Sequence, residues 1–296
     1  MPRLFLAFFA ATLLTHAASP FAGRWDIVIT SGNDKYPDWM ELVEQSGDPQ
    51  VRVQRRSDTV VPARDVKLDG EHLTLSFAKN YNWDLTVAGG ELSGTQKQGD
   101  QVAQIKGVRA PELKRDPPKS WTAPEPLFNG KDLTGWEPDN PSINHWVADG
   151  GVLLNKEHGA NLRTTRKFED FKLHIELNCP DGGNSGIYLR GRYEIQVAYE
   201  KGPDAYHSMG AIYGFLKPSV EMPRKPGDWE SFDAMLVGRR LTLVRDGVTI
   251  MNQLEIPGIT GGALDSNEAD PGIFYIQGDH TGGMKYRNIT IALPKR

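Results

Sequence analysis

Residues 182–197 carry the side chains that are best suited to chemistry. Apolar and polar residues alternate along much of this stretch with period two, as in a half-buried β-strand. The polar set combines a phenol, a guanidinium, a carboxylate and an amide, supplied by Tyr188, Arg190, Glu194 and Gln196. Such groups form several hydrogen bonds each, which suits a polar ligand better than it suits a plain solvated surface.

The turn within this stretch decides whether the four side chains share one face. A two-residue turn at Gly191 and Arg192 would pair Arg190 with Tyr193 and would send Glu194 to the opposite face. A three-residue loop over 191–193, or one continuous bent strand, would keep the four together, and we expect this shared face. A surface ion pair between Arg190 and Glu194 would explain the same residues without any ligand, because such pairs are common and contribute little.

The elements that must position these groups are short strands. The chain has 296 residues, which suits about two domains, and its 39% hydrophobic and 24% charged residues are ordinary for a soluble globular protein. The 31 glycines, 20 prolines and many alternating runs favour β-structure. A net charge of -4 without a basic stripe argues against a nucleic-acid partner.

Residues 1–19 have the pattern of a signal peptide. Arg3 precedes an apolar run over 4–14, and small residues follow at 17–19. Because the run is short for a membrane span, we expect cleavage near 17–19, no stable membrane anchor, and a periplasmic or secreted protein. Cys179 is the sole cysteine of the sequence, which excludes an internal disulfide and a thiol-based metal cluster.

Residues 20–110 are predicted to form a small antiparallel β-barrel or a strongly curled meander. After a strand that opens at Gly23, strand-like runs lie near 40–44, 50–55, 60–67, 72–77, 83–87, 91–96 and 102–108. We favour an interior filled by side chains over a ligand cavity. Residues 111–126 contain five prolines and are predicted to be an extended linker, in which Trp121 is the residue that could dock against a domain.

Residues 127–296 are predicted to form an antiparallel two-sheet sandwich. A hairpin turn is expected at 149–151, and further strands at 231–237, 240–245, 272–277 and 286–292. The stretch 171–178 alternates cleanly, with His174, Glu176 and Asn178 on the face opposite its apolar residues. No helix of convincing length is expected there, so the whole chain is predicted to be all-β.

Several short motifs of this region occur in an order that resembles a known family. They are Leu-Phe-Asn-Gly-Lys-Asp-Leu-Thr-Gly-Trp from 127, Gly-Asn-Ser-Gly-Ile-Tyr-Leu-Arg-Gly from 183 with Tyr-Glu-Ile-Gln from 193, Gly-Ala-Ile-Tyr-Gly from 210, Gly-Asp-Trp-Glu from 227, and Gln-Gly-Asp-His from 277 with Tyr-Arg-Asn-Ile from 286. Over about 125–296 the chain resembles the 3-keto-disaccharide hydrolase family. The resemblance implies a concanavalin A-like jelly-roll sandwich with a sugar site on its concave sheet.

The resemblance also implies cleavage of glycosides whose glucose C3 hydroxyl has been oxidised to a ketone. Such a ketone acidifies the hydrogen on C2, so a base can remove it and the C1–oxygen bond can break by elimination. Water then adds to the unsaturated sugar, and the net result is hydrolysis. This route needs a base, a stabiliser of the enolate oxygen and an acid for the leaving group, but not the paired carboxylates of ordinary glycosidases.

Roles follow from membership of these motifs. We expect Glu194 or His280 as the base, Arg190 as the enolate stabiliser and Glu176 as a second acid–base candidate. The residues expected to orient sugar hydroxyls are Asn184, Tyr188, Gln196, Asp279 and Arg287. Tyr213 or Trp229 would stack on a sugar face, although a tryptophan is more often a core residue. The role of Glu230 stays open.

The expected partner is a small carbohydrate substrate, and the oligomeric state is left open. We expect no cofactor. A divalent cation stays an open question, because Asp204 and His207 alone are weak support for a metal site. A non-catalytic, lectin-like envelope protein is the alternative function, because sandwiches of this kind also serve lectins.

Overall fold

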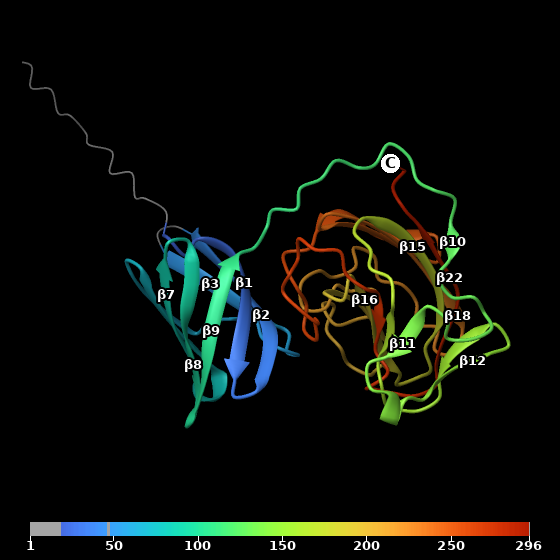
Figure 1. Cartoon of the computed structure of the whole chain (residues 1–296), viewed down its shortest axis with the longest axis horizontal. Coiled ribbons are helices and arrows are strands. Elements are labelled where there is room, and N and C mark those ends of the chain that lie inside the picture. Colours follow the sequence, from blue (N-terminus) through green and yellow to red (C-terminus); the bar gives the residue numbers. More distant parts are fainter. Residues whose placement is uncertain (1–18, 46–47, 296) are drawn as a thin grey trace, which may run out of the picture.

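A computed structural model describes residues 19–45 and 48–295, which form two β-domains joined by an extended segment (Figure 1). Both are built from antiparallel strands, so the predicted all-β class is confirmed. Apart from Ser19, the expected signal peptide lies outside the described residues. Within the described ranges, no helix is long and apolar enough to cross a membrane.

The first domain is a nine-stranded meander that curls on itself. Its strands are β1 (Gly23–Ser31), β2 (Asp34–Gln45), β3 (Asp48–Gln54), β4 (Val60–Pro62), β5 (Asp65–Asp69), β6 (His72–Phe77), β7 (Tyr81–Ala88), β8 (Glu91–Gln98) and β9 (Gln101–Arg109), with the 3-10 turn η1 (Ala78–Asn80) before β7. The sheet order is β4-β3-β2-β1-β9-β8-β7-β6-β5. Ala63 N donates to Val51 O of β3 and Arg64 N donates to Ser76 O of β6, so these residues bring the two ends of the sheet together.

Side chains fill much of the barrel, and a cavity of about 400 Å³ opens at one end, lined in part by Tyr36, Tyr81 and Gln96. Inward side chains of alternate positions form one buried cluster, which includes Trp25, Met40, Trp83 and Ile105. A polar group closes part of one end, where Gln96 accepts hydrogen bonds from the Tyr81 hydroxyl and the Trp83 indole. The barrel therefore has its own hydrophobic core.

The proline-rich segment after β9 runs along the second domain (Figure 1). Trp121 forms a bridge with Pro294 near the C-terminus, and the Lys172 ammonium lies 5.1 Å from the centre of its ring. Thr122 N donates to Leu293 O at 2.8 Å. Trp121 thus docks the segment on the second domain.

The second domain is a concanavalin A-like jelly-roll sandwich of two antiparallel sheets. One has the order β12-β13-β22-β15-β18-β19-β20, with β10 also paired to β22, and the other has the order β11-β14-β21-β16-β17. The strands are β10 (Glu125–Pro126), β11 (Trp136–Pro138), β12 (Trp146–Asp149), β13 (Val152–Asn155), β14 (Leu162–Thr164), β15 (Phe171–Asn178), β16 (Asn184–Leu189), β17 (Tyr193–Ala198), β18 (Trp229–Val237), β19 (Arg240–Arg245), β20 (Val248–Glu255), β21 (Tyr275–Ile276) and β22 (Met284–Ala292), with the 3-10 turn η2 (Pro141–Ile143) before β12.

Alternation along the strands builds the core between the sheets. Phe171, Leu173, Ile175 and Leu177 of β15 are buried in it, as predicted. From the smaller sheet, Ile187 of β16 and Ile195 of β17 enter the same cluster. The residues that alternate with these apolar ones on β16 and β17 therefore face away from the core. This outward face carries Tyr188, Glu194 and Gln196.

The barrel contacts the sandwich through β1, β2 and the loop after β3. The Trp39 ring of β2 joins the core cluster of the sandwich and meets the Phe215 ring edge-on at 5.1 Å. The Arg24 guanidinium of β1 pairs with the Glu255 carboxylate. In Figure 1, β1 and β2 lie on the side of the barrel toward the sandwich, whereas β7 lies on the far side.

We expect stability of the domain contact to depend on pH through Asp26. Its carboxyl is buried, and burial together with the neighbouring Glu268 raises the pKa to about 9, although Arg239 and Arg192 act in the opposite direction. A raised pKa means that the stabilisation is complete below the unfolded value near 4 and is lost as the pH rises to about 9. Asp26→Asn removes this loss, so its urea midpoint should exceed that of wild type by more at pH 8 than at pH 5.

Asp84→Asn, at an exposed residue of the barrel, is the control for this measurement. Equal differences between Asp26→Asn and wild type at the two pH values would contradict the prediction.

Candidate active site

The hairpin of β16 and β17 decides which side chains meet. Tyr188 lies opposite Glu194 and Leu189 lies opposite Tyr193, so the connecting loop has three residues, Arg190 to Arg192. Arg190 and Gly191 both have positive φ, 56° and 69°. Because directly opposed residues share a face of the sheet, Tyr188 and Glu194 point the same way.

The expectation that Arg190 shares this face is wrong. The loop begins one residue earlier than a 191–193 loop would, so Arg190 lies in the turn rather than on the strand. Its Nη2 donates to the Tyr193 hydroxyl at 2.9 Å, and that hydroxyl donates to Glu268 Oε1 at 2.7 Å. Tyr193 belongs to the core side of β17, so Arg190 is held away from Glu194 and cannot stabilise an enolate beside it.

A row of polar and aromatic side chains crosses the outward face of the smaller sheet. The cross-strand pairs run from Arg163 to Tyr275, from Tyr275 to Tyr188, and from Tyr188 to Glu194. Beyond Glu194, Tyr213 N donates to Glu194 O at 3.2 Å, which places Tyr213 next along the row. The rings of Tyr188 and Tyr275 meet edge-on at 4.7 Å.

Glu194 is the buried carboxyl of this row, with only 3% of its surface exposed. The Tyr188 hydroxyl donates to its Oε2 at 2.8 Å. Burial raises the pKa of Glu194 to about 8, against the lowering effects of the Tyr188 hydrogen bond and of His280. A carboxylate with this pKa is a stronger base than an ordinary glutamate and is still available in its charged form near neutral pH.

The Tyr188 hydroxyl can follow the protonation of Glu194. It accepts from Gln277 Nε2 at 3.1 Å and lies 2.7 Å from Gly261 O and 2.8 Å from Glu194 Oε2. A phenol has a single proton to donate. Charged Glu194 takes that hydrogen bond, whereas protonated Glu194 can donate to the phenol, which then donates to Gly261 O.

Gly186 makes room for the carboxylate. A Cβ atom at this position would lie 2.2 Å from Glu194 Oε1. Gly186→Ala should therefore displace the carboxylate and lower kcat by about 100-fold, the scale of a displacement of about 1 Å in a catalytic group. The thermal midpoint, measured in parallel, separates this effect from unfolding. Activity within twofold of wild type in a folded variant would contradict the prediction.

His280 and Asp279 lie at the open edge of the same face. His280 Nδ1 is 2.8 Å from Asp279 Oδ1, and Asn161 Nδ2 donates to Asp279 Oδ2 at 3.4 Å. The Asp279 hydrogen bond raises the pKa of His280, with further contributions from the charges of Asp279 and Glu194. An imidazolium is therefore favoured, and its charge acts on the buried Glu194, which is an arrangement suited to acid–base chemistry.

Two buried amides on this face have acceptors to spare. In the described part of the chain, Gln196 Oε1 and Gln277 Oε1 are buried and have no hydrogen-bond partner. Gln196 Nε2 donates to Asn184 Oδ1 at 3.4 Å, which brings Asn184 to the same place. Because buried polar atoms are normally paired, these oxygens suit the hydroxyl groups of a ligand.

Three predicted residues lie elsewhere, on the other sheet. Glu176 Oε2 accepts from Arg287 Nε at 2.6 Å, and the Arg287 guanidinium lies 4.0 Å from the centre of the Trp229 ring. Glu176, Arg287 and Trp229 share the outer face of β15, β22 and β18, so they do not join Glu194. Of the two aromatic residues proposed to stack on sugar, Tyr213 alone lies beside Glu194.

No group of three or more His, Cys, Asp and Glu side chains in the described ranges is arranged to hold a metal ion. His207 Nδ1 lies 2.8 Å from Asp204 Oδ1, but its Nε2 lies 2.8 Å from the Thr59 hydroxyl of the barrel. Both ring nitrogens therefore have protein partners.

Several residues of this face were not predicted from the sequence. Tyr275 and Gln277 precede Asp279 at two-residue steps, so the alternation of one strand could have identified them. Thr260 and Gly261 carried no comparable signal. Thr260 Oγ1 accepts from Glu194 N at 3.0 Å, a contact between residues 66 positions apart.

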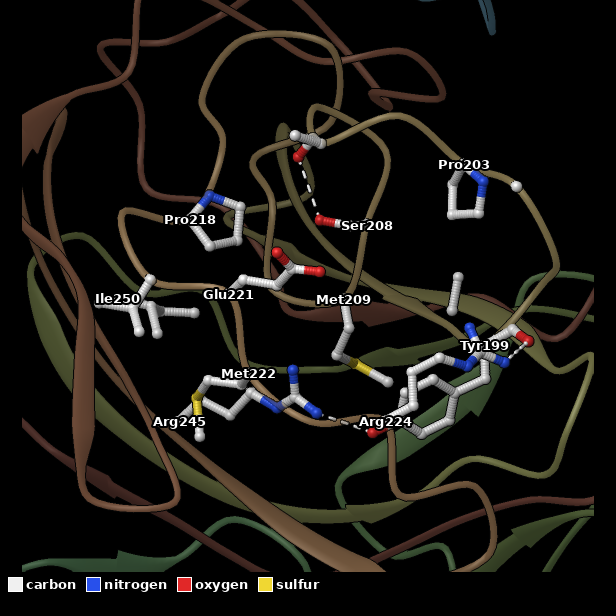
Figure 2. Close-up of a pocket in the computed structure, with 14 residues that line it drawn as sticks. Tyr199, Pro203, Ser208, Met209, Pro218, Glu221, Met222, Arg224, Arg245 and Ile250 are labelled. Atoms are coloured by element: carbon white, nitrogen blue, oxygen red, sulfur yellow. Dashed lines mark hydrogen bonds between the residues drawn. The ribbon is translucent and has the colours of Figure 1, made fainter.

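A separate cavity of about 420 Å³ is lined in part by Pro203, Ser208 and Met209 (Figure 2). Its walls include Tyr199, Met209, Met222 and Ile250, with the guanidinium groups of Arg224 and Arg245 on one side. Glu194 is not among its lining residues. Glu221 supplies the carboxylate of this cavity.

Residues 123–292, more than half of the chain, match the family model described as "3-keto-alpha-glucoside-1,2-lyase-like domain". A solved structure of a candidate glycosyl hydrolase from Parabacteroides distasonis is 28% identical, with a TM-score of 0.50 over 61% of this chain and 93% of that one. A second candidate glycosyl hydrolase from the same organism is 17% identical, with a TM-score of 0.48 over 58% of this chain and 93% of that one. No curated protein matches the chain significantly.

Proposed function

The chain belongs to the 3-keto-alpha-glucoside-1,2-lyase-like family, and from this premise we propose that it cleaves 3-keto-glycosides, 3-keto-disaccharides in particular. In general terms, it is a carbohydrate-active enzyme that acts on glycosides. The observation that carries the finer proposal is the buried Glu194, which accepts a hydrogen bond from Tyr188 and has a raised pKa, on the face whose exposed edge holds the His280–Asp279 pair.

The first step is removal of the C2 proton by the Glu194 carboxylate. The electrons of the C2–H bond form the enolate, whose negative charge rests on the C3 oxygen. Asn184 and Gln196 supply amide N–H donors on this face, in place of Arg190. Preorganised donors of this kind stabilise the charge that develops in the transition state.

The second step is elimination. The C3 carbonyl re-forms, a double bond forms between C1 and C2, and the bond from C1 to the leaving oxygen breaks. The His280 imidazolium, whose pKa is raised by the Asp279 hydrogen bond, gives the leaving oxygen its proton. Water then adds its hydroxyl group to C1 while neutral His280 takes the second proton of the water, and Glu194 returns its proton to C2, so that both residues regain their starting states.

The test compares 3-keto-trehalose with trehalose in water and in deuterium oxide. We expect cleavage of 3-keto-trehalose but not of trehalose. In deuterium oxide, NMR should detect deuterium at C2 of the released 3-ketoglucose. Cleavage of trehalose itself would overturn the proposal, because it would not need the ketone, whereas product without deuterium at C2 would mean that Glu194 returns the abstracted proton before it exchanges with solvent. Binding of both sugars without turnover of either would favour the lectin-like alternative.

A further inference from the structure

The loop between β3 and β4 of the barrel, residues 55–59, lies against the sandwich segment 260–262. Gly262 N donates to Arg56 O at 2.8 Å. A Cβ atom at Gly261 would come within 2.5 Å of Asp58 O, so the two backbones approach as closely as a glycine allows. We call residues 55–59 the barrel loop.

Segment 260–262 separates the barrel loop from the buried base. On its other side, the Thr260 hydroxyl accepts from Glu194 N, and Gly261 O lies 2.7 Å from the Tyr188 hydroxyl. A Cβ atom at Gly262 would lie 2.5 Å from that hydroxyl. The barrel loop is therefore only one segment away from the Glu194–Tyr188 pair.

The barrel loop also reaches the aromatic residue beside Glu194. Thr59 Oγ1 lies 2.8 Å from His207 Nε2, and the His207 ring meets the Tyr213 ring edge-on at 4.8 Å. A Cβ atom at Gly214, the next residue, would lie 2.5 Å from the same threonine oxygen. The next barrel residue, Val60, packs against the sandwich core, which anchors this end of the loop.

Charge near Tyr213 agrees with this placement. Burial raises the pKa of the Tyr213 phenol, and the carboxylates of Glu194 and Asp58 raise it further. The Glu194 carboxylate belongs to the sandwich, and the Asp58 carboxylate belongs to the barrel. Tyr213 thus lies between the two domains, and interfaces between domains are frequent locations of ligand sites.

We propose that the barrel loop is a wall of the active site and that Thr59 is a positioning residue, which holds Tyr213 against the sugar through His207. This inference rests on the proposed function. It assigns the first domain to the catalytic unit, since its loop shapes the site of the second domain. The expected ligand is the same 3-keto-disaccharide, with a pyranose face on the Tyr213 ring.

Thr59→Val replaces the hydroxyl with a methyl group of similar size and leaves His207 Nε2 without this partner. For 3-keto-trehalose we expect KM to rise about 5- to 10-fold, the effect of one lost hydrogen bond, while kcat stays within about twofold. Thr59→Ser keeps the hydroxyl and should restore KM. Thr74→Val, on the outer face of β6, is the matched control and should behave as wild type.

The outcomes separate the inference from the proposed function. Suppose that wild type cleaves 3-keto-trehalose. The inference alone is overturned if Thr59→Val leaves KM unchanged, or if Thr59→Ser is as impaired as Thr59→Val. If wild type binds trehalose in calorimetry but does not cleave 3-keto-trehalose, the proposed function fails. The inference then stands if Thr59→Val weakens trehalose binding at least fivefold against Thr74→Val, and falls if it does not. If wild type neither binds trehalose nor cleaves 3-keto-trehalose, both the inference and the proposed function are overturned.

Discussion

Glu194→Gln is expected to lower kcat/KM for 3-keto-trehalose by about 10²- to 10⁴-fold, the usual contribution of a positioned general base. Glutamine keeps the size of the side chain and can still accept a hydrogen bond from Tyr188, but it cannot take a proton from C2. Steady-state rates of ketosugar release measure the effect. Glu176→Gln is the matched control: Glu176 lies on the other sheet in an ion pair with Arg287, so its replacement should leave the rate within about twofold.

The pH profile gives this prediction a second readout. Because the base must be charged and its pKa is raised to about 8 by burial, kcat/KM of wild type should rise with pH through about 8. Deprotonation of His280, whose pKa is also raised, should lower the rate at alkaline pH, because the acid must be protonated. The rising limb should vanish in Glu194→Gln. A rate that is flat between pH 6 and 9 in wild type would contradict the role of Glu194.

Glu194→Gln should raise the stability of the protein at high pH although it lowers the activity. The raised pKa of Glu194 means that its contribution to stability is complete below the unfolded value near 4 and is lost as the pH rises through about 8. Glu194→Gln removes this loss. Its urea midpoint should therefore exceed that of wild type at pH 9 and approach it at pH 5, although its activity is low at both.

The strands of the site could be predicted from the sequence because a period of two fixes which residues share a face. Tyr188 on β16, and Glu194 and Gln196 on β17, follow from alternation and from the three-residue hairpin. Arg190 does not, because one residue of difference in the start of the loop moved it from the strand into the turn. Register at a turn depends on local backbone angles, here two residues with positive φ, that the sequence does not determine alone.

The remaining differences concern which elements meet in space. Alternation correctly places Glu176 outward on β15, but it cannot say that β15 belongs to the other sheet. Likewise, the contact of Thr59 with His207 joins residues 148 positions apart in two domains. Tertiary packing decides such contacts, so the sequence supplied the candidates and the structure divided them between two faces.

Glu230→Ala is expected to destabilise the sandwich by about 3–5 kcal/mol, the usual effect of removing one partner of a buried ion pair. Arg245 Nε donates to Glu230 Oε2 at 2.7 Å, the Tyr199 hydroxyl donates to Glu230 Oε1, and Arg245 Nη2 donates to the Tyr199 oxygen at 2.7 Å. Glu230 and Arg245 are both nearly fully buried, and Tyr199 and Arg245 also line the separate cavity (Figure 2). The motif residue whose role the sequence left open is therefore part of a structural network.

The double replacement Glu230→Leu with Arg245→Met tests whether the ion pair itself stabilises the fold, or whether Glu230→Ala destabilises it by leaving the Arg245 charge unpaired. Apolar side chains of similar size leave no buried charge without a partner, so this variant should recover most of the lost stability. Urea unfolding at pH 7 gives the free energies of unfolding, and Glu176→Ala, which breaks a more exposed ion pair, should cost less than Glu230→Ala. A double variant as unstable as Glu230→Ala would mean that the network stabilises the fold through its geometry rather than through compensation of the Arg245 charge.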